Sequence, residues 1–412
     1  MIELGGNYDS FKNLLHLLFY NMNYSHIILN KGKETSSLRF HPWIFSGAIA
    51  NKEASVKEGD VVEVYSHQNQ YLGTGYYANG SIAIRFISFK KVSINEEFWF
   101  NKISDAFNYR KHLGILNPST NVCRLFFGEG DGASGLILDY YNGHVVFQAH
   151  SWGIYLQKEN ITNAIIKVLG NALKSIYDKS AETLPKQLNA QPQNNYLFGQ
   201  NNDEVIVIEN NYKFKIDFIK GQKTGFFIDQ RDNRQLLAQY SKNKTVLNTF
   251  CYTGGFSIYA AATANLVHSI DVSASAIDLC NINIQLNNLT NNQSYIEDTF
   301  DFLKDKKDVY DVIVLDPPAF AKSRESKHNA VTAYKRLNTT ALKYIKPNGI
   351  LFTFSCSGVV DKYLFYNTIT SAAIEAKRNV RVLHYLHQPP DHPVTPNFPE
   401  GEYLKGMVLW VE

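Results

Sequence analysis

The stretch TVLNTFCYTGGFSIYAAATANLVHSIDVS, Thr245 to Ser273, decides the fold of the C-terminal half of this chain. It runs from an apolar β segment through a Gly-Gly turn into a helical segment, and it ends in a second β segment that closes on an acid. Strands that alternate with helices in this way form parallel, doubly wound sheets. The alternation continues beyond it, with further strands expected at YDVIVLD, GILFTFS, VRVLHYL and GMVLWVE. We therefore expect an α/β domain over residues 205–412.

Two different patterns precede this domain. Residues 23–91 contain short β segments separated by turn residues, as in EGDVVEVYSHQNQYLGTGYYANGSIAIRFIS, which predicts a small β-barrel or sandwich. Residues 92–204 mix helical segments with a glycine-rich hairpin, which predicts a central α+β domain. The Asn/Gln-rich stretch from Asp178 to Asp203 breaks all periodicity, so we expect a linker or loop there. Residues 1–22 are expected to be an N-terminal extension.

The composition is that of a globular protein of two or three domains, with 412 residues, of which 44% are hydrophobic and 19% charged. The apolar run from Phe11 to Met22 is far shorter than the ~20 residues that a membrane span needs, so no membrane partner is expected. Four cysteines form no Cys-x-x-Cys pair and no Cys/His cluster, which predicts no metal site and fits a cytoplasmic protein. They are Cys123, Cys251, Cys280 and Cys356.

A ligand site is expected at the carboxyl ends of the strands, where open parallel sheets bind ligands. Gly254, in the turn after the first strand, lets the backbone approach a ligand closely. Asp271 ends the second strand, where a carboxylate accepts hydrogen bonds from ribose hydroxyls, and Asp298 lies in the third turn, where it could bind an adenine amine. Each acid could instead cap the helix that follows it. The set predicts S-adenosylmethionine as cofactor, and its other turn residues are Asn248, Phe250, Tyr252 and Thr253.

Asp316 and Cys356 end the fourth and fifth strands and are expected to be neighbours at the rim of the sheet. Pro317 and Pro318 hold the turn after Asp316, so its carboxyl group should point off the sheet edge into the cofactor and catalytic pocket. A cysteine thiolate that adds to carbon 6 of a pyrimidine makes carbon 5 nucleophilic, while a carboxyl group can hydrogen-bond to nitrogen 3 of cytosine. The alternative is that Cys356 is a small buried hydrophobe, as we expect for the other cysteines.

This chemistry needs a site that favours the thiolate, because a thiol has a pKa of roughly 8.5. Lys322, Arg324 or a helix N-terminus could favour it. Basic residues are frequent nearby, since the run 322–346 has seven Lys and Arg against one acid, and the run 213–244 has eight against three. Such runs attract phosphate backbones, which predicts an RNA partner; a solvated helix face is the alternative.

Longer motifs carry a resemblance to a known family. The chain resembles the bacterial 23S ribosomal RNA 5-methylcytosine methyltransferases of the large-subunit methyltransferase I type in GQKTGFFIDQRDNR (221–234), CYTGGFS, DPPAFAKS, FSCSG and DHPVTPNFPEGEYLKG (391–406). HPWIFSGAI (41–49) is similar to the start of that family's PUA domain, an RNA-binding barrel, and RLFFGEGDGASGLILDYY (124–141) is similar to its central domain.

The resemblance implies a multidomain α/β protein with a PUA-like domain, a central RNA-docking domain and a Rossmann-like class I methyltransferase domain. It implies that Cys356 is the nucleophile and that the product is 5-methylcytosine in 23S rRNA. It also implies that part of GFFIDQR closes over the cofactor, namely Phe226, Phe227, Asp229 and Gln230.

Alternatives to this reaction stay open. One is methylation of a guanine nitrogen, although Ala319 occupies the position where amino-methylating enzymes often place a stacking aromatic. Another is a non-catalytic RNA-binding or assembly factor. The oligomeric state is open too, with a homodimer as one option.

Overall fold

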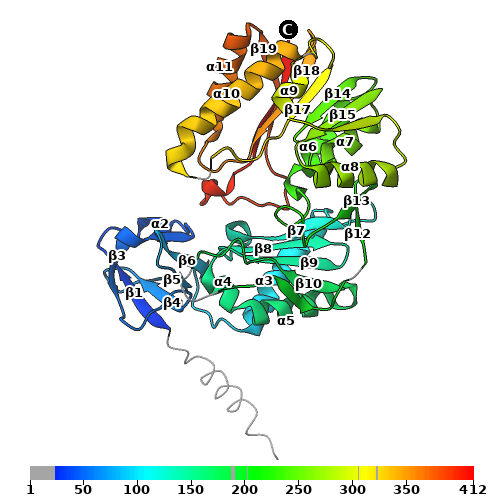
Figure 1. Ribbon diagram of the computed structural model, residues 1–412. Coiled ribbons are helices and arrows are strands. Elements are labelled where there is room, and N and C mark those ends of the chain that lie inside the picture. Colours follow the sequence, from blue (N-terminus) through cyan, green and yellow to red (C-terminus); the bar gives the residue numbers. More distant parts are fainter. Residues whose placement is uncertain (1–23, 187–190, 202, 305, 322) are drawn as a thin grey trace, which may run out of the picture. The chain divides into compact units, whose positions relative to one another are not determined.

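The computed structural model describes residues 24–186, 191–201, 203–304, 306–321 and 323–412 (Figure 1). The expected N-terminal extension and Lys322 lie outside these ranges. The chain forms two compact units. The first comprises the described residues up to Gly114, Leu125–Asn201 and Val394–Phe398, and the second comprises Ile115–Arg124, Asn202–Pro393 and Pro399–Glu412. The domain boundaries expected near residues 91 and 204 stay predictions.

The N-terminal part of the first unit is a six-stranded sheet in the order β2-β6-β5-β4-β1-β3. Its neighbouring strands are antiparallel, except for the parallel pair β1 and β4. In β4 the buried side chains alternate with partly exposed ones, which is the period-two pattern visible in the sequence. The elements are β1 (Ser25–Leu29), α2 (Thr35–Leu38), β2 (Trp43–Phe45), β3 (Ile49–Lys52), β4 (Val61–Tyr65), β5 (Tyr71–Tyr77) and β6 (Ile82–Ser88).

The rest of the first unit is a five-stranded sheet in the order β11-β10-β9-β8-β7, against which two longer helices pack. Trp99 and Ile103 of the first helix and Ile165 of the second are fully buried in its core. Asn95 caps the first helix by accepting a hydrogen bond from Phe98 N at 2.9 Å. The elements are α3 (Glu96–His112), β7 (Val122–Phe127), β8 (Leu136–Tyr141), β9 (His144–Ala149), α4 (Trp152–Leu156), α5 (Lys158–Leu169), β10 (Ser175–Asp178) and β11 (Asn195–Phe198).

The expectation of a linker from Asp178 to Asp203 is wrong for part of that stretch. Strand β11 lies within it and pairs antiparallel with β10, and Tyr196 contacts Tyr177 edge to face at 5.0 Å between ring centroids. Ser180 is buried and accepts a hydrogen bond from Ala149 N at 2.9 Å. The four residues of β11 are too few to show a period among Asn and Gln, so cross-strand packing decides their structure.

The second unit contains a hairpin and a seven-stranded sheet in the order β16-β15-β14-β17-β18-β20-β19. The strands from β14 to β18 are parallel, as predicted, but β20 runs antiparallel to both of its neighbours. The strand β16, the third strand counted before the turn of Asp298, was not delimited from the sequence, because NQSYI is mostly polar. The strands are β12 (Val205–Glu209), β13 (Tyr212–Ile216), β14 (Thr245–Thr249), β15 (Leu266–Asp271), β16 (Asn292–Ile296), β17 (Val312–Leu315), β18 (Gly349–Ser355), β19 (Val380–Leu386) and β20 (Lys405–Val411).

Helices cover both faces of this sheet (Figure 1). Val312 and Val314 of β17 pack with Leu237 and Phe256 on one face of the sheet. Ile313, between them, packs in the hydrophobic core on the opposite face, because side chains alternate along a strand. Among the described residues, no helix is long and apolar enough to cross a membrane. The helices are α6 (Arg231–Tyr240), α7 (Gly255–Ala261), α8 (Ala274–Leu286), α9 (Thr299–Leu303), α10 (Lys327–Tyr344) and α11 (Lys362–Ala376).

The strand order places the ligand site. From β14 the chain moves outward to β15 and β16, and then returns to form β17 on the other side of β14. The topological switch point therefore lies between β14 and β17, at their carboxyl ends.

Candidate active site

The glycine turn after β14 has an unusual backbone. Phe250, Tyr252 and Gly254 have φ angles of 53°, 48° and 84°, so three residues out of five are left-handed. A Cβ atom on Gly254 would lie 2.6 Å from the Sγ atom of Cys280. Glycine is therefore required at 254 by the φ angle and by packing against α8, and not only by the approach of a ligand.

Asp271 stabilises this turn from the end of β15. Its Oδ2 atom accepts a hydrogen bond from Tyr252 N at 3.0 Å, and its Oδ1 atom accepts one from Ser273 N at 2.9 Å. The cap of α8 is Ser273, whose hydroxyl accepts a hydrogen bond from Ala276 N. The capping alternative is thus wrong for Asp271, which is partly exposed at the rim.

Asp298 does cap a helix. It is exposed, and its Oδ1 atom accepts hydrogen bonds from Phe300 N at 2.8 Å and from Asp301 N at 3.4 Å, at the start of α9. Its role towards an adenine stays a prediction. Two apolar side chains that sequence reasoning missed lie at the same rim: Val272 is 70% exposed and Ile296 is 58% exposed. Ile296 pairs in register with Asp271, and Val272 directly follows Asp271. The positions of both apolar residues at the strand ends were therefore the available sequence signal.

The GFFIDQR segment packs against the glycine turn. The ring of Phe227 contacts the Tyr252 ring edge to face at 5.2 Å, and the Tyr252 hydroxyl accepts a hydrogen bond from Gln222 N at 3.0 Å. Phe226 is buried, with the guanidinium of Arg234 over its ring at 4.6 Å. Phe227 and Tyr252 are therefore better placed than Phe226 to meet a ligand. Asn248 is buried near the end of β14 and Thr253 is buried in the turn, and the Oδ1 atom of Asn248 has no hydrogen-bond partner among the described residues.

Asp316, Asp229 and Cys356 come together at the end of β17 and β18. Gln230 Nε2 donates a hydrogen bond to Asp316 Oδ2 at 3.1 Å. Tyr403, from the C-terminal segment, donates one to Asp229 Oδ2 at 2.5 Å. The Oδ1 atom of Asp229 is buried, and the described residues offer it no hydrogen-bond partner.

Burial and repulsion shift the protonation of this group. Burial, together with the charge of Asp229, raises the pKa of Asp316 to about 7. Burial and the charges of Asp316 and Asp229 raise the pKa of the Cys356 thiol to about 12. The side chains around Cys356 do not by themselves favour the thiolate, because burial and then the two carboxylates outweigh the opposite effect of Lys223. Loss of the charge on a neighbouring carboxylate would favour ionisation of this thiol.

Lys405 is a site residue that sequence reasoning missed. It lies on β20 opposite Ser355, it is buried, and its Nζ atom donates to Ser357 O at 2.6 Å and to Val360 O at 2.7 Å. Burial lowers its pKa to about 8. The turn that follows Cys356 is therefore held by a buried ammonium. A single lysine before the apolar run GMVLWV was the available sequence signal.

The other cysteines behave as predicted. Cys123, Cys251 and Cys280 are buried, Cys356 is partly exposed, and no disulfide occurs among the described residues.

Acidic partners partly neutralise the basic run on α10. Lys335 lies 2.8 Å from Glu375, Lys346 lies 3.0 Å from Asp311, and Arg336 stacks on the ring of Phe300 at 4.6 Å. Several basic residues of the run 322–346 therefore fit the alternative given above, in which they lie on a solvated helix face and do not bind phosphate.

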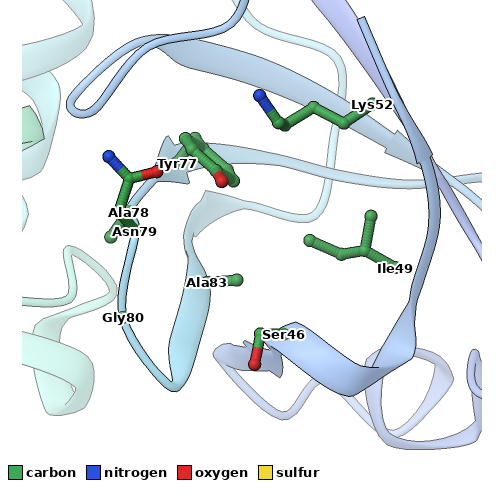
Figure 2. A pocket seen from close by; sticks show the side chains of 8 residues that line it. All are labelled: Ser46, Ile49, Lys52, Tyr77, Ala78, Asn79, Gly80 and Ala83. Carbon is green, nitrogen blue, oxygen red and sulfur yellow. The ribbon is translucent and has the colours of Figure 1, made fainter. Parts of the chain in front are cut away.

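The N-terminal sheet carries a hollow of about 270 Å³, shown in Figure 2. Lys52 lies over the ring of Tyr77 there, with Nζ 4.9 Å from the ring centroid, and it donates a hydrogen bond to Val56 O at 3.0 Å. Basic and aromatic side chains are the two kinds that proteins combine where they bind single-stranded nucleic acids.

Comparison with known proteins decides the family. A model described as S-adenosylmethionine-dependent methyltransferase matches residues 181–407, and one described as PUA-like domain matches residues 27–89. Proteins named Ribosomal RNA large subunit methyltransferase I from Aeromonas hydrophila and Vibrio vulnificus (strain YJ016) are each 38% identical to this chain, over 93% of its length and 98% and 99% of theirs. The chain belongs to the large subunit methyltransferase I family. The predictions of a PUA-like domain, a class I methyltransferase domain and S-adenosylmethionine as cofactor are confirmed.

Solved structures agree with the methyltransferase fold and with the cofactor. A structure described as a SAM-dependent methyltransferase from Streptococcus mutans superposes with a TM-score of 0.80 at 26% identity, covering 93% of this chain and 99% of that one. A methyltransferase complexed with SAH superposes with a TM-score of 0.82 at the same identity and coverage. The rim described above fits such a cofactor, because the carboxylate of Asp271 is partly exposed and Asn248 Oδ1 lacks a partner among the described residues.

Proposed function

We propose that this enzyme methylates carbon 5 of a cytosine in 23S rRNA through a covalent adduct with Cys356. Strands β17 and β18 are hydrogen-bonded neighbours, and they bring Asp316 and Cys356 to the same end of the sheet. The electrostatic interaction between these two side chains is the observation that supports the proposal most. The names of the relatives support ribosomal RNA of the large subunit as the substrate class.

The two residues have complementary tasks. Asp316, as a carboxylate, takes the proton of the Cys356 thiol, which leaves a thiolate beside a neutral acid. The thiolate adds to carbon 6, and the Asp316 acid donates its proton towards nitrogen 3, where charge develops. S-adenosylmethionine supplies an electrophilic methyl group to the carbon 5 that this addition activates. A pKa of about 7 suits a group that must both accept and donate a proton near neutrality.

Other residues hold the cofactor and the RNA in this proposal. Asp271 accepts hydrogen bonds from the ribose hydroxyls, and Val272 and Ile296 flank the adenine with their exposed apolar side chains. The PUA-like domain contributes the hollow beside Lys52 and Tyr77 to RNA docking. We place the enzyme in the cytoplasm, which the lack of disulfides among the described residues supports.

The test is mass spectrometry of nucleosides from rRNA incubated with the protein and methyl-labelled S-adenosylmethionine. We expect label in 5-methylcytidine, no label with Cys356→Ala, and label retained with the matched variant Cys123→Ala, which removes a buried thiol outside the site. Calorimetry should show that Cys356→Ala still binds the cofactor. Label in a methylguanosine that persists in Cys356→Ala would contradict the proposal, and no label from any variant would favour a non-catalytic RNA-binding role.

A further inference from the structure

We infer that Asp229 is the base that removes the carbon 5 proton after methyl transfer. The inference rests on the proposed function, because only a covalent adduct at carbon 6 makes this step necessary. After methylation, carbon 5 carries both the new methyl group and its original hydrogen. The product cannot leave until that hydrogen departs as a proton.

The step balances as an elimination. The bond between carbon 5 and its hydrogen breaks, and the proton goes to a carboxylate oxygen. The electron pair of that bond forms the double bond between carbons 5 and 6, while the bond between carbon 6 and sulfur breaks and returns Cys356 as a thiolate. Nitrogen 3 returns its proton to Asp316, which passes it back to the Cys356 thiolate, and the base later loses its own proton to solvent. No oxidant or further reactant is needed.

Geometry selects Asp229 among the groups near the nucleophile. Its Oδ1 atom is buried without a hydrogen-bond partner among the described residues, although a buried carboxylate oxygen normally has one. Gln230, the next residue along the chain, donates a hydrogen bond to Asp316 Oδ2 at 3.1 Å, so Asp229 lies at the same end of β17. Its charge also contributes to the raised pKa values of Asp316 and Cys356. Tyr403 donates a 2.5 Å hydrogen bond to Oδ2, so that Oδ1 is the oxygen left to accept a proton.

The neighbouring titratable groups suit this task less well. In the proposed mechanism Asp316 faces nitrogen 3, to which it has just donated a proton, and its Oδ2 atom accepts a hydrogen bond from Gln230 Nε2. Lys405 donates its hydrogens to Ser357 O and Val360 O, and an ammonium cannot accept a proton. Among the described residues, the groups that interact electrostatically with Cys356 include Asp229, Asp316, Lys223, Tyr334, Tyr403 and Lys405.

The test compares Asp229→Asn on ordinary RNA with the unaltered enzyme on RNA that contains 5-fluorocytidine. Fluorine at carbon 5 cannot leave as a cation, so the unaltered enzyme should be trapped as an adduct that survives SDS. Asp229→Asn should give the same adduct on ordinary RNA, with cofactor affinity within about threefold of the unaltered protein. Its multiple-turnover rate should fall by at least about 100-fold, the usual contribution of a general base.

Matched variants distinguish loss of the base from a general effect of removing a carboxylate and from loss of cofactor binding. Asp232→Asn makes the same change at a half-exposed carboxylate three residues away, and it should turn over normally without an adduct. Asp271→Asn should weaken cofactor binding without trapping RNA. If Asp229→Asn turns over normally, or loses cofactor affinity and forms no adduct, Asp229 is not the base.

A failure of the proposed function looks different. In that case the unaltered enzyme forms no adduct with 5-fluorocytidine RNA, and the inference falls with it. If Asp229→Asn does not fold, Tyr403→Phe removes only one hydroxyl group from Asp229 Oδ2. It should accumulate a smaller amount of adduct on ordinary RNA, and normal turnover without adduct would overturn the inference.

Discussion

At the scale of single residues, Asp316 and Cys356 share one proton above a pH of about 7. The raised pKa values make the form with both groups protonated dominant below that pH. The proposed reaction needs the pair with one proton, since the carboxylate must receive the proton of the thiol. The pH dependence of activity therefore reports on the pair and not on either residue alone.

Because Asp316 and Cys356 share one proton, the methylation rate is predicted to rise with pH. The single-turnover methylation rate at low RNA concentration should increase about tenfold per pH unit below pH 7 and level off above it, because loss of one proton creates the reactive pair. In Asp316→Asn the rise should move to higher pH, since the thiol must then ionise without its proton acceptor. A rate that is flat or falls between pH 5.5 and 7 would contradict this assignment.

The sequence could not separate the roles of Asp271 and Asp298. Both are acids between a strand and a helix, where cap and ligand contact look alike. The structure separates them because α8 begins after Ser273, two residues beyond Asp271, whereas α9 begins directly after Asp298. Their place at the rim was predictable from the alternation of strands and helices, but the hydrogen bonds were not.

At the scale of elements, the turn that ends in Gly254 packs closely against helix α8. Gly254→Ala should destabilise the protein by roughly 2–4 kcal/mol, because it combines a left-handed φ of 84° with a Cβ atom 2.6 Å from Cys280 Sγ. Urea denaturation of Gly254→Ala, Cys280→Ala and the double variant measures this. The double variant should be more stable than the sum of the single effects predicts, and strict additivity would show that the sulfur does not cause the strain.

Strand β20 holds the turn after Cys356 through the hydrogen bonds that Lys405 donates to it. Lys405→Met should cost about 1–3 kcal/mol, because it leaves the carbonyl groups of Ser357 and Val360 without their donor. The matched variant Lys346→Met breaks a partly exposed ion pair at the opposite end of β18 and should cost less than about 1 kcal/mol. If urea denaturation shows equal losses of stability for Lys405→Met and Lys346→Met, Lys405 does not stabilise the turn in this way.

The direction of β20 was beyond sequence reasoning. Its apolar run predicts a strand, but a run of side chains does not tell whether the strand enters the sheet parallel or antiparallel. Its antiparallel entry between β18 and β19 sets Lys405 opposite Ser355, beside the proposed nucleophile. The role of Lys405 follows from this register and could only come from the structure.

At the scale of the whole molecule, segments far apart in sequence build the site of the second unit. Asp391 receives hydrogen bonds from Arg231 on α6 at 2.9 and 3.0 Å and from Arg124 N at 3.0 Å. Twelve residues later Tyr403 reaches Asp229. The sequence showed the motifs but not that the C-terminal segment returns to them, because long-range contacts leave no periodic pattern.

Asp391 should therefore stabilise the fold. Burial opposes its ionisation, but the charges of His392 and Arg231 outweigh burial and hold the pKa of Asp391 well below its usual range. Asp391→Asn should cost about 3–5 kcal/mol near neutral pH, because it leaves a buried guanidinium without its carboxylate. Since the pKa is lowered by folding, this contribution is complete above the unfolded pKa of about 4, declines as the pH falls below it, and is fully lost only below the much lower folded pKa.

The matched variant for this prediction is Asp232→Asn, which removes a half-exposed carboxylate 3.4 Å from the same Arg231. It should cost less than about 1 kcal/mol at any pH. Denaturation at pH 7 and at pH 3 compares the two, and an Asp391→Asn loss that persists unchanged at pH 3 would show that packing, not charge, is responsible.

The central claim is that carbon 5 of a cytosine is methylated, and release of tritium from RNA made with 5-tritiated cytidine tests it most directly. Methylation at carbon 5 must expel the hydrogen there, so we predict one tritium released to water for each methyl group transferred, and neither event with Cys356→Ala. Methyl transfer that leaves all the tritium in the RNA would place the reaction on another atom.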